Sequence, residues 1–226
     1  MINQKFSAAL FDMDDTLIDR HSAYGDVYRV LYDQNEAIHD STSWKDALEY
    51  FWTLSPDNTA NANTAIFEIQ KKWPGVPGDS KSHYNFYFSN MVKFIKVLPG
   101  AVEFVDWMNS KSVAWGIVTN GDQFQHKKAE ATGLNNKAPF VLASKIFGVD
   151  KPAPEVFMEA VRLLEIEGLK TEDVLFVGDN PYTDIVGAHG VGMKTAWIRM
   201  GRKYPSDAPT PDYIVDHVEE LKHFLA

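Results

Sequence analysis

The sequence predicts an α/β fold, a doubly wound parallel sheet interrupted by an inserted all-helical segment. Three apolar runs rich in β-branched and aromatic residues each end at a polar turn cluster, at Phe6–Phe11, Val113–Val118 and Val174–Val177. Such runs suit strands buried on both faces. Amphipathic segments at Ala101–Asn109 and Pro154–Glu165 lie between them. Strands that alternate with helices in this way predict a Rossmann-like sheet covered on both sides.

The alternation continues to the C-terminus. Further strands are expected at Thr195–Arg199 and Tyr213–Val215, and a closing helix at Val218–Leu225. In the earlier helix, Pro154 lies near the first turn, where the N–H that proline lacks would have no helical partner. These elements complete the expected sheet.

Residues 19–96 differ from the rest because they contain no clear pair of strands. Aromatic residues recur there at helical intervals, and turn-forming breaks at Ser55–Asn58 and Pro74–Gly78 separate the helices. We therefore expect a core domain formed by residues 1–18 and 97–226, and a helical domain formed by residues 19–96.

The charge balance limits the partners of the chain. Its 226 residues include 22 basic and 31 acidic side chains, for a net charge of −9. This balance opposes binding to nucleic acid or to an anionic membrane surface, since both are polyanions. No stretch approaches the roughly 18 uncharged apolar residues that a membrane helix needs. Without cysteine the chain cannot form disulfides or thiolate sites, and we expect a protein of the reducing cytoplasm.

Three aspartates follow the first expected strand: Asp12, Asp14 and Asp15. Carboxylates crowded against a buried strand repel one another unless a cation lies between them. Mg²⁺ is the natural partner because it prefers oxygen ligands. The alternative, that Asp14 and Asp15 cap a following helix, explains one aspartate but not three.

The next two clusters could bind an anion. Thr119, Asn120 and Gly121 follow the second run, where a hydroxyl and successive N–H groups can face a phosphate near a helix N-terminus. Lys151 precedes a helix and can neutralise a phosphate or a carboxylate. Taken singly, an ordinary Asn-Gly turn and a solvated surface lysine explain these residues as well.

The fourth cluster follows the run Val174–Val177. Gly178 allows a sharp exit from the strand, and Asp179 and Asp184 bracket a proline-containing loop. The two aspartates form a second acidic pair, although either alone could belong to a simple turn. In parallel sheets, ligands bind beyond the carboxyl ends of the strands, where all four clusters lie.

In chain order, the clusters resemble the motifs of the haloacid dehalogenase (HAD) superfamily. The D-x-D-x-T pattern is found at Asp12, Asp14 and Thr16, the hydroxyl at Thr119, and the lysine at Lys151. The G-D-x4-D pattern closes the series at Gly178, Asp179 and Asp184. The helical insert resembles the C1 cap of subfamily I phosphatases. The resemblance therefore implies a Mg²⁺-dependent phosphatase acting on a small-molecule phosphate ester.

The resemblance also implies a role for each residue. Asp12 would be the nucleophile that forms an aspartyl-phosphate, and Asp14 the general acid and base. Mg²⁺ would be held by the Asp12 and Asp179 carboxylates and the Asp14 main-chain carbonyl, with Asp184 steadying the ligands.

The remaining implied roles concern the transferring phosphoryl group and the leaving group. Thr119 and Lys151 would act on the phosphoryl group as catalytic residues. The residues expected to bind the phosphate are Met13, Asn120 and Gly121. At the start of the cap, Arg20, His21 and Tyr24 could reach the leaving group, although surface or packing roles explain them better.

Other functions stay open at this point. A phosphomutase would keep every core motif, whereas a hydrolytic dehalogenase needs neither a second catalytic aspartate nor a metal, so Asp14 and Asp179 argue against it. A phosphate-accepting receiver domain combines similar residues, but it is about half as long and lacks a helical insert. None of these patterns identifies the substrate.

Overall fold

The computed structural model describes residues 5–55 and 62–225. The chain divides into two compact units. The first comprises Met1–Asp19 and Lys96–Ala226, and the second comprises Arg20–Ile95. We call them the core unit and the helical unit.

The described residues of the core unit form a six-stranded, all-parallel sheet of order β3-β2-β1-β4-β5-β6. Its central strands β1 and β4 pair in register from Ala8 opposite Val174 to Phe11 opposite Val177. The strands span Ala8–Phe11 (β1), Ala114–Thr119 (β2), Val141–Ala143 (β3), Val174–Gly178 (β4), Lys194–Ile198 (β5) and Tyr213–Val215 (β6). The prediction of a doubly wound parallel sheet is confirmed.

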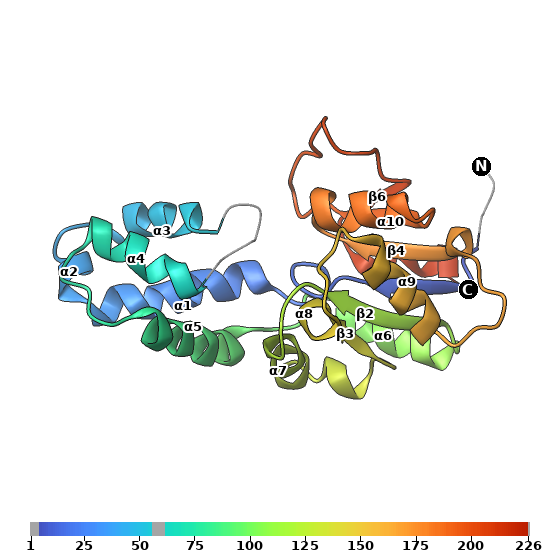
Figure 1. Ribbon diagram of the computed structural model, residues 1–226, viewed down its shortest axis with the longest axis horizontal. Coiled ribbons are helices and arrows are strands. Elements are labelled where there is room, and N and C mark those ends of the chain that lie inside the picture. Colours follow the sequence, from blue (N-terminus) through green and yellow to red (C-terminus); the bar gives the residue numbers. More distant parts are fainter. Residues whose placement is uncertain (1–4, 56–61, 226) are drawn as a thin grey trace. The chain divides into compact units, whose positions relative to one another are not determined.

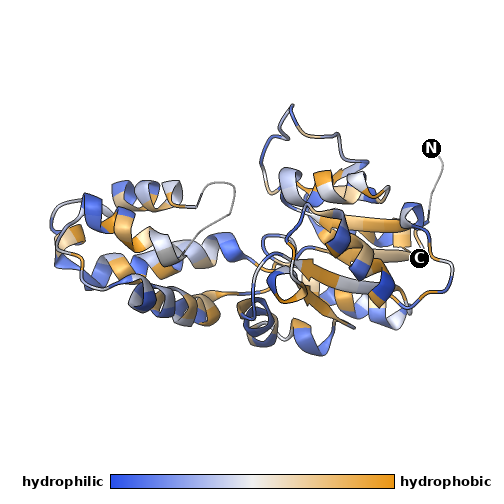
Figure 2. Cartoon of the chain, viewed as in Figure 1, coloured by the Kyte–Doolittle hydropathy of each residue, from blue (hydrophilic) through white to orange (hydrophobic). Residues whose placement is uncertain are grey.

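Helices cover both faces of this sheet (Figure 1). Side chains of successive strand residues point to opposite faces. Phe176 packs edge-on against Phe157 of α9 (Pro154–Leu163) on one face, with ring centroids 5.0 Å apart. On the other face, the Phe11 ring lies 5.8 Å from that of Phe104 in α6 (Ala101–Ser110) and 6.0 Å from that of Trp115, measured between ring centroids. Hydrophobic stretches accordingly lie along the strands in Figure 2, interrupted by paler residues.

The helices of the core unit connect these strands. Those of α-helical type are α6 (Ala101–Ser110), α7 (Phe124–Ala131), α8 (Ser144–Phe147), α9 (Pro154–Leu163), α10 (Val186–Gly190) and α11 (Lys222–Leu225). Short helices of other types are η2 (Leu134–Asn136), η3 (Thr171–Asp173), η4 (Pro181–Ile185) and η5 (Val218–Leu221). Pro154 does occupy the first turn of α9.

Element boundaries depart from the predicted ones by a few residues. The predicted helix Pro154–Glu165 ends at Leu163, because Glu165 adopts a left-handed backbone with φ of 54°. The predicted helix Val218–Leu225 is divided between the 3₁₀ helix η5 and α11. Strand β3 was not predicted, since its three residues are too few for a recognisable apolar run.

The described part of the helical unit contains helices and no strand. They are α1 (Arg20–Gln34), α2 (Glu36–His39), α3 (Trp44–Thr53), α4 (Ala62–Lys72) and α5 (Ser80–Phe94). The side chain of Ser43 caps α3 by accepting from the Asp46 N–H, and Asp79 and Ser82 form a reciprocal capping box at α5. Of the predicted break Ser55–Asn58, residues 56–58 lie outside the described residues.

An aromatic core holds these helices together. Tyr28 stacks on Phe51 with ring centroids 4.5 Å apart, and Phe51 contacts Trp73 at 5.6 Å. The Tyr24 hydroxyl donates to the Phe51 carbonyl at 2.6 Å, which satisfies a polar group that is otherwise buried. The Tyr24–Tyr28 stripe of α1 is therefore a packing face.

Among the described residues, no helix is both long and apolar enough to cross a membrane.

Candidate active site

The site lies at the carboxyl ends of the central strands. Asp12 follows β1 and is anchored there because its N–H donates to the Val177 carbonyl of β4 at 2.8 Å. Thr119 ends β2, and Asp179 follows β4. The parallel register thus brings together three predicted site residues that belong to separate clusters of the sequence.

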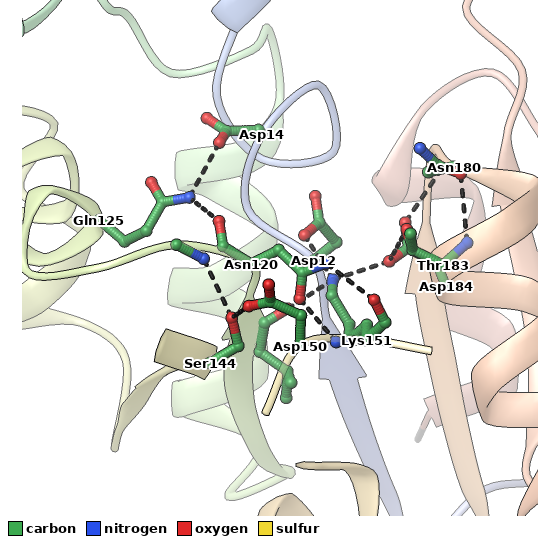
Figure 3. Close-up of polar contacts among 12 residues, drawn as sticks. Asp12, Asp14, Asn120, Gln125, Ser144, Asp150, Lys151, Asn180, Thr183 and Asp184 are labelled. Carbon is green, nitrogen blue, oxygen red and sulfur yellow. Dashed lines mark hydrogen bonds and ion pairs between the residues drawn. The ribbon is translucent and has the colours of Figure 1, made fainter. Parts of the chain in front are cut away.

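Lys151 connects these strand ends. Its Nζ donates to Asp12 Oδ1 at 2.7 Å, to Asp184 Oδ1 at 2.7 Å and to the Val118 carbonyl at 2.8 Å (Figure 3). The ammonium group has all three of its donors satisfied, although its side chain is only 1% exposed. Lys151 is therefore a buried cation held between two carboxylates.

Burial and charge together set the protonation of this cluster. Burial raises the pKa of Asp12 to about 7; Lys151 opposes this rise, whereas Asp184 and Asp14 add to it. Burial, followed by the charges of Asp184 and Asp12, raises the pKa of Asp179 well above its usual range. Burial lowers the pKa of Lys151, but Asp12 and Asp184 outweigh it and keep the pKa above its usual value.

Three carboxylates form a candidate metal site. Oxygen atoms of Asp12, Asp179 and Asp184, all buried, lie within 4.8 Å of one another. Lys151 contacts two of these carboxylates and Arg202 contacts Asp179, so three ionised carboxylates exceed their two cations by one negative charge. A further positive charge would stabilise the cluster. An all-oxygen donor set suits a hard divalent ion such as Mg²⁺. The residues present therefore fit the ion.

The loop after β4 holds Asp184 in place. Asn180 N–H donates to Asp184 Oδ2 at 3.0 Å, and the Asn180 side chain accepts from the N–H groups of Tyr182 and Thr183. A Cβ atom at Gly178 would collide with the Asp184 carboxylate. Gly178 is therefore needed for the space it leaves beside Asp184.

The loop after β2 is built on Asn120. Its side chain donates to the Lys151 carbonyl at 3.0 Å and accepts from the Lys151 N–H at 2.8 Å, which fixes the backbone that carries this lysine. The Gly121 N–H donates to Ser144 Oγ at 3.0 Å, and Ser144 in turn donates to Asp150. Donation from Gly121 to a phosphate stays a prediction, because the Gly121 N–H would have to give up its bond to Ser144.

Thr119 presents a free hydroxyl. The residue is 1% exposed, and its Oγ1 has no hydrogen-bond partner among the described residues. The same holds for Thr16 Oγ1. Met13 is fully buried as a residue, so its contact with a phosphate stays a prediction.

The Asp14 carboxylate lies outside the three-carboxylate cluster and points toward α7 (Figure 3). Lys128 Nζ donates to both of its oxygens, at 2.5 Å for Oδ1, and Gln125 Nε2 donates to Oδ2 at 3.2 Å. Neither residue was predicted from the sequence, because a lysine and a glutamine one turn apart in a polar helix carry no motif.

Arg202 was also missed. Its Nη1 donates to Asp179 Oδ2 at 3.1 Å, and its Nη2 donates to the Asp179 carbonyl at 3.1 Å. The Trp197 indole N–H donates to the same carbonyl at 2.8 Å. The loop after β5 thus helps to orient Asp179.

The three candidate residues of the helical unit have different environments. Arg20 is buried and donates to Ser55 Oγ at 3.3 Å, and Tyr24 is fully buried. His21 is exposed and stacks on Trp52 with ring centroids 4.2 Å apart. Tyr24 is thus a packing residue, while any contact of Arg20 or His21 with a substrate stays a prediction.

The arrangement of the site agrees with the similarity of the whole chain to known proteins. A sequence model of the haloacid dehalogenase-like hydrolases matches residues 6–192. The chain belongs to this family. Membership in the HAD family rules out the receiver-domain alternative, and it confirms the resemblance seen in the motifs.

Among the proteins that this HAD hydrolase matches over nearly their whole length are enzymes named as phosphatases. The glyceraldehyde 3-phosphate phosphatase of Pyrococcus furiosus is 27% identical, over 98% of this chain and 92% of that protein. The pyrimidine 5'-nucleotidase YjjG of Escherichia coli is 27% identical, over 98% of each chain. The crystal structure of the HAD-hydrolase YfnB of Bacillus subtilis bound to magnesium has a TM-score of 0.77 at 24% identity. It covers 98% of this chain and 99% of that one, and so shows the shared fold.

Proposed function

We propose that this HAD hydrolase is a Mg²⁺-dependent phosphatase that cleaves a small phosphorylated metabolite through an aspartyl-phosphate on Asp12. One observation carries the proposal: the buried Asp12 carboxylate lies between Lys151 and two further carboxylates. A nucleophile that attacks an anionic ester needs a positive charge beside it, and its side chain must be held in one orientation. Lys151 meets both needs.

In the first step, an Asp12 oxygen attacks phosphorus and the bond between phosphorus and the leaving oxygen breaks. For this step one Asp14 oxygen has to carry a proton and exchange its contact with Lys128 for the leaving oxygen. Asp14 then gives this proton to that oxygen, so the leaving group departs as an alcohol. Lys151 and the free Thr119 hydroxyl stabilise charge on the transferring phosphoryl group. Bound Mg²⁺ would be held by the Asp12 and Asp179 carboxylates and the Asp14 carbonyl, where it offsets repulsion between nucleophile and ester.

In the second step, water attacks the phosphorus atom of the aspartyl-phosphate and the bond to the Asp12 oxygen breaks. Asp14, now ionised, takes the proton of this water. Phosphate leaves and the Asp12 carboxylate is regenerated. Asp184 supports both steps by holding Lys151 at 2.7 Å.

The names of the related phosphatases indicate which phosphate esters to test as substrates. The proteins named above act on glyceraldehyde 3-phosphate and pyrimidine nucleotides, and others are named N-acylneuraminate-9-phosphatase and phosphoserine phosphatase. We infer that the helical unit, residues 19–96 in the sequence analysis, serves as a cap that contacts the leaving group. Arg20 and His21 are its candidate contacts, because each offers donors for an anionic or hydroxylated group.

A panel of these four classes of phosphate ester tests the proposal, with released phosphate measured in Mg²⁺. The parent should hydrolyse at least one ester, and Asp12→Asn should lose turnover while keeping its far-UV circular dichroism spectrum. A haloacid tests the dehalogenase alternative, since several dehalogenases share this fold. Halide release without phosphate release would overturn the proposal, as would near-normal phosphatase turnover by Asp12→Asn. Transfer of the phosphoryl group to a second hydroxyl of the substrate, without phosphate release, would indicate a phosphomutase.

A further inference from the structure

Two buried side chains of α7 contact the carboxylate of Asp14. Lys128 Nζ donates to both carboxylate oxygens, and Gln125 Nε2 donates to one of them (Figure 3 shows the Gln125 contact). The partners are more than one hundred residues apart in the sequence, so the fold alone brings them together. Gln125 is 6% exposed and Lys128 5%.

Because Lys128 is buried, its ammonium group depends on the contact with Asp14. A buried ammonium group is costly unless a carboxylate pairs with it, and α7 is otherwise a largely polar helix that could have kept this lysine in solvent. Lys127, the adjacent residue, is exposed. One of two neighbouring lysines is therefore directed inward to Asp14.

Gln125 also connects Asp14 to the loop that follows β2. Its Nε2 donates to the Asn120 carbonyl as well as to Asp14. Gly121 has φ of 140°, and a Cβ atom there would lie 2.9 Å from both Cγ and Nε2 of Gln125. The glycine thus leaves the space in which Gln125 lies, and the loop, Gln125 and Asp14 form one connected unit.

We propose that Gln125 and Lys128 are positioning residues that hold the Asp14 carboxylate beside α7, apart from the three-carboxylate cluster. The inference rests on the proposed function and adds to it a reason why one aspartate of the site can serve as acid and base. A carboxylate among the metal ligands would be committed to the ion, whereas Asp14 is kept out of that cluster. The main chain of Asp14 stays next to Asp12 while its side chain is directed elsewhere.

Accurate placement of this group has a measurable effect. General acid help is worth roughly 10²–10⁴ in rate, and a misplacement of about 1 Å can cost about 10²-fold. The benefit depends on the leaving group, because a poor leaving group needs the proton and a good one departs without it. Loss of positioning should therefore show itself in the dependence of rate on the leaving group.

The test compares phenyl phosphate, a poor leaving group, with p-nitrophenyl phosphate, a good one of similar shape. For Lys128→Met we expect kcat/KM to fall about 10- to 100-fold with phenyl phosphate and less than about threefold with p-nitrophenyl phosphate. Since kcat/KM extends only to the first irreversible step, hydrolysis of the aspartyl-phosphate does not affect this comparison. Gln125→Met should show the same pattern with a smaller loss, and Lys128→Arg should restore much of the activity toward phenyl phosphate.

The exposed neighbour provides the matched control: Lys127→Met should leave both rates unchanged. Equal losses with the two esters in Lys128→Met, or no loss, would overturn the inference while leaving the phosphatase function intact. Failure of the parent to hydrolyse either ester in Mg²⁺, together with failure on the metabolite panel, would instead contradict the proposed function. If Lys128→Met does not fold, as judged by circular dichroism, Gln125→Met decides the question by the same ratio of losses with the two esters.

Discussion

Lys151 Nζ lies 2.7 Å from a carboxylate oxygen of Asp12. The same nitrogen is equally close to Asp184 Oδ1. The ammonium group therefore neutralises part of the charge of a cluster whose carboxylates would otherwise repel one another. It also holds the proposed nucleophile in one orientation before any substrate arrives.

Replacement of Lys151 by Met should therefore destabilise the protein. Removing one partner of a buried ion pair leaves a buried charge unpaired, which typically costs about 3–5 kcal/mol. We expect a loss of this size in the free energy of unfolding, measured by urea denaturation in a chelator. Mg²⁺ should recover part of it, because the ion takes over neutralisation of the carboxylates. The exposed Lys145→Met is the control, and an equal loss in both variants would contradict the role of Lys151.

Turnover should require a divalent cation. Treatment with EDTA should abolish phosphate release and added Mg²⁺ should restore it, because three buried carboxylates need a cation when an anionic ester binds. In Asp179→Asn, the Mg²⁺ concentration for half-maximal rate should rise about tenfold or more, since a charged ligand is lost. The exposed Glu172→Gln should leave this concentration unchanged. Full activity in EDTA would exclude the metal site.

A methyl group at Gly178 should displace Asp184. The added Cβ atom would meet the Asp184 carboxylate, which cannot retreat without loosening its contact with Lys151. We expect Gly178→Ala to lower kcat by about 10²-fold, the size of effect that a displacement of about 1 Å can produce. Gly190→Ala, at a helical position with open space, should have little effect on kcat. Similar rates in both variants would show that Asp184 tolerates the displacement.

His83 should make the stability of the protein depend on pH. Burial lowers the pKa of His83 from 6.5 to about 4, in a site where its ring lies 3.5 Å from the Tyr28 hydroxyl. Between these two pH values the unfolded state binds a proton that the folded state does not, so stability is full above pH 6.5 and falls as the pH decreases toward 4.

The difference attributable to His83 should be about 2 kcal/mol between pH 7 and pH 5. Urea unfolding of the parent and of His83→Phe at both pH values measures it. The pH dependence should be smaller in His83→Phe by this amount. The exposed His126→Gln should keep the slope of the parent. An unchanged slope in His83→Phe would show that His83 does not lose its proton on folding.

Much of the core fold was predictable from local patterns. The central strands are continuous apolar runs because both of their faces are buried, and each run ends where a functional residue begins. The short edge strand β3 escaped prediction because its three residues carry no periodicity. The reason for Gly178 was also missed: its value lies in the space it leaves for Asp184, a contact that no local pattern reveals.

The candidate site was predictable only in part, for a related reason. Asp12, Lys151 and Asp184 occur in motifs of fixed order, and the parallel sheet brings them into contact. Lys128 and Gln125 belong to no motif, and their importance becomes visible only when α7 is placed beside Asp14. Their neighbour Lys127 is indistinguishable from Lys128 by residue type, yet it is exposed.

The most direct measurement is chemical trapping of the intermediate on Asp12. Enzyme quenched during turnover with Mg²⁺ and a hydrolysable ester is treated with borohydride, which reduces an acyl phosphate to an alcohol. Mass spectrometry of the peptide that contains Asp12 should then find homoserine at position 12, only when substrate and Mg²⁺ were both present. Reduction at a different aspartate, or an Asp12→Asn variant that turns over while position 12 stays unmodified, would contradict nucleophilic catalysis by Asp12.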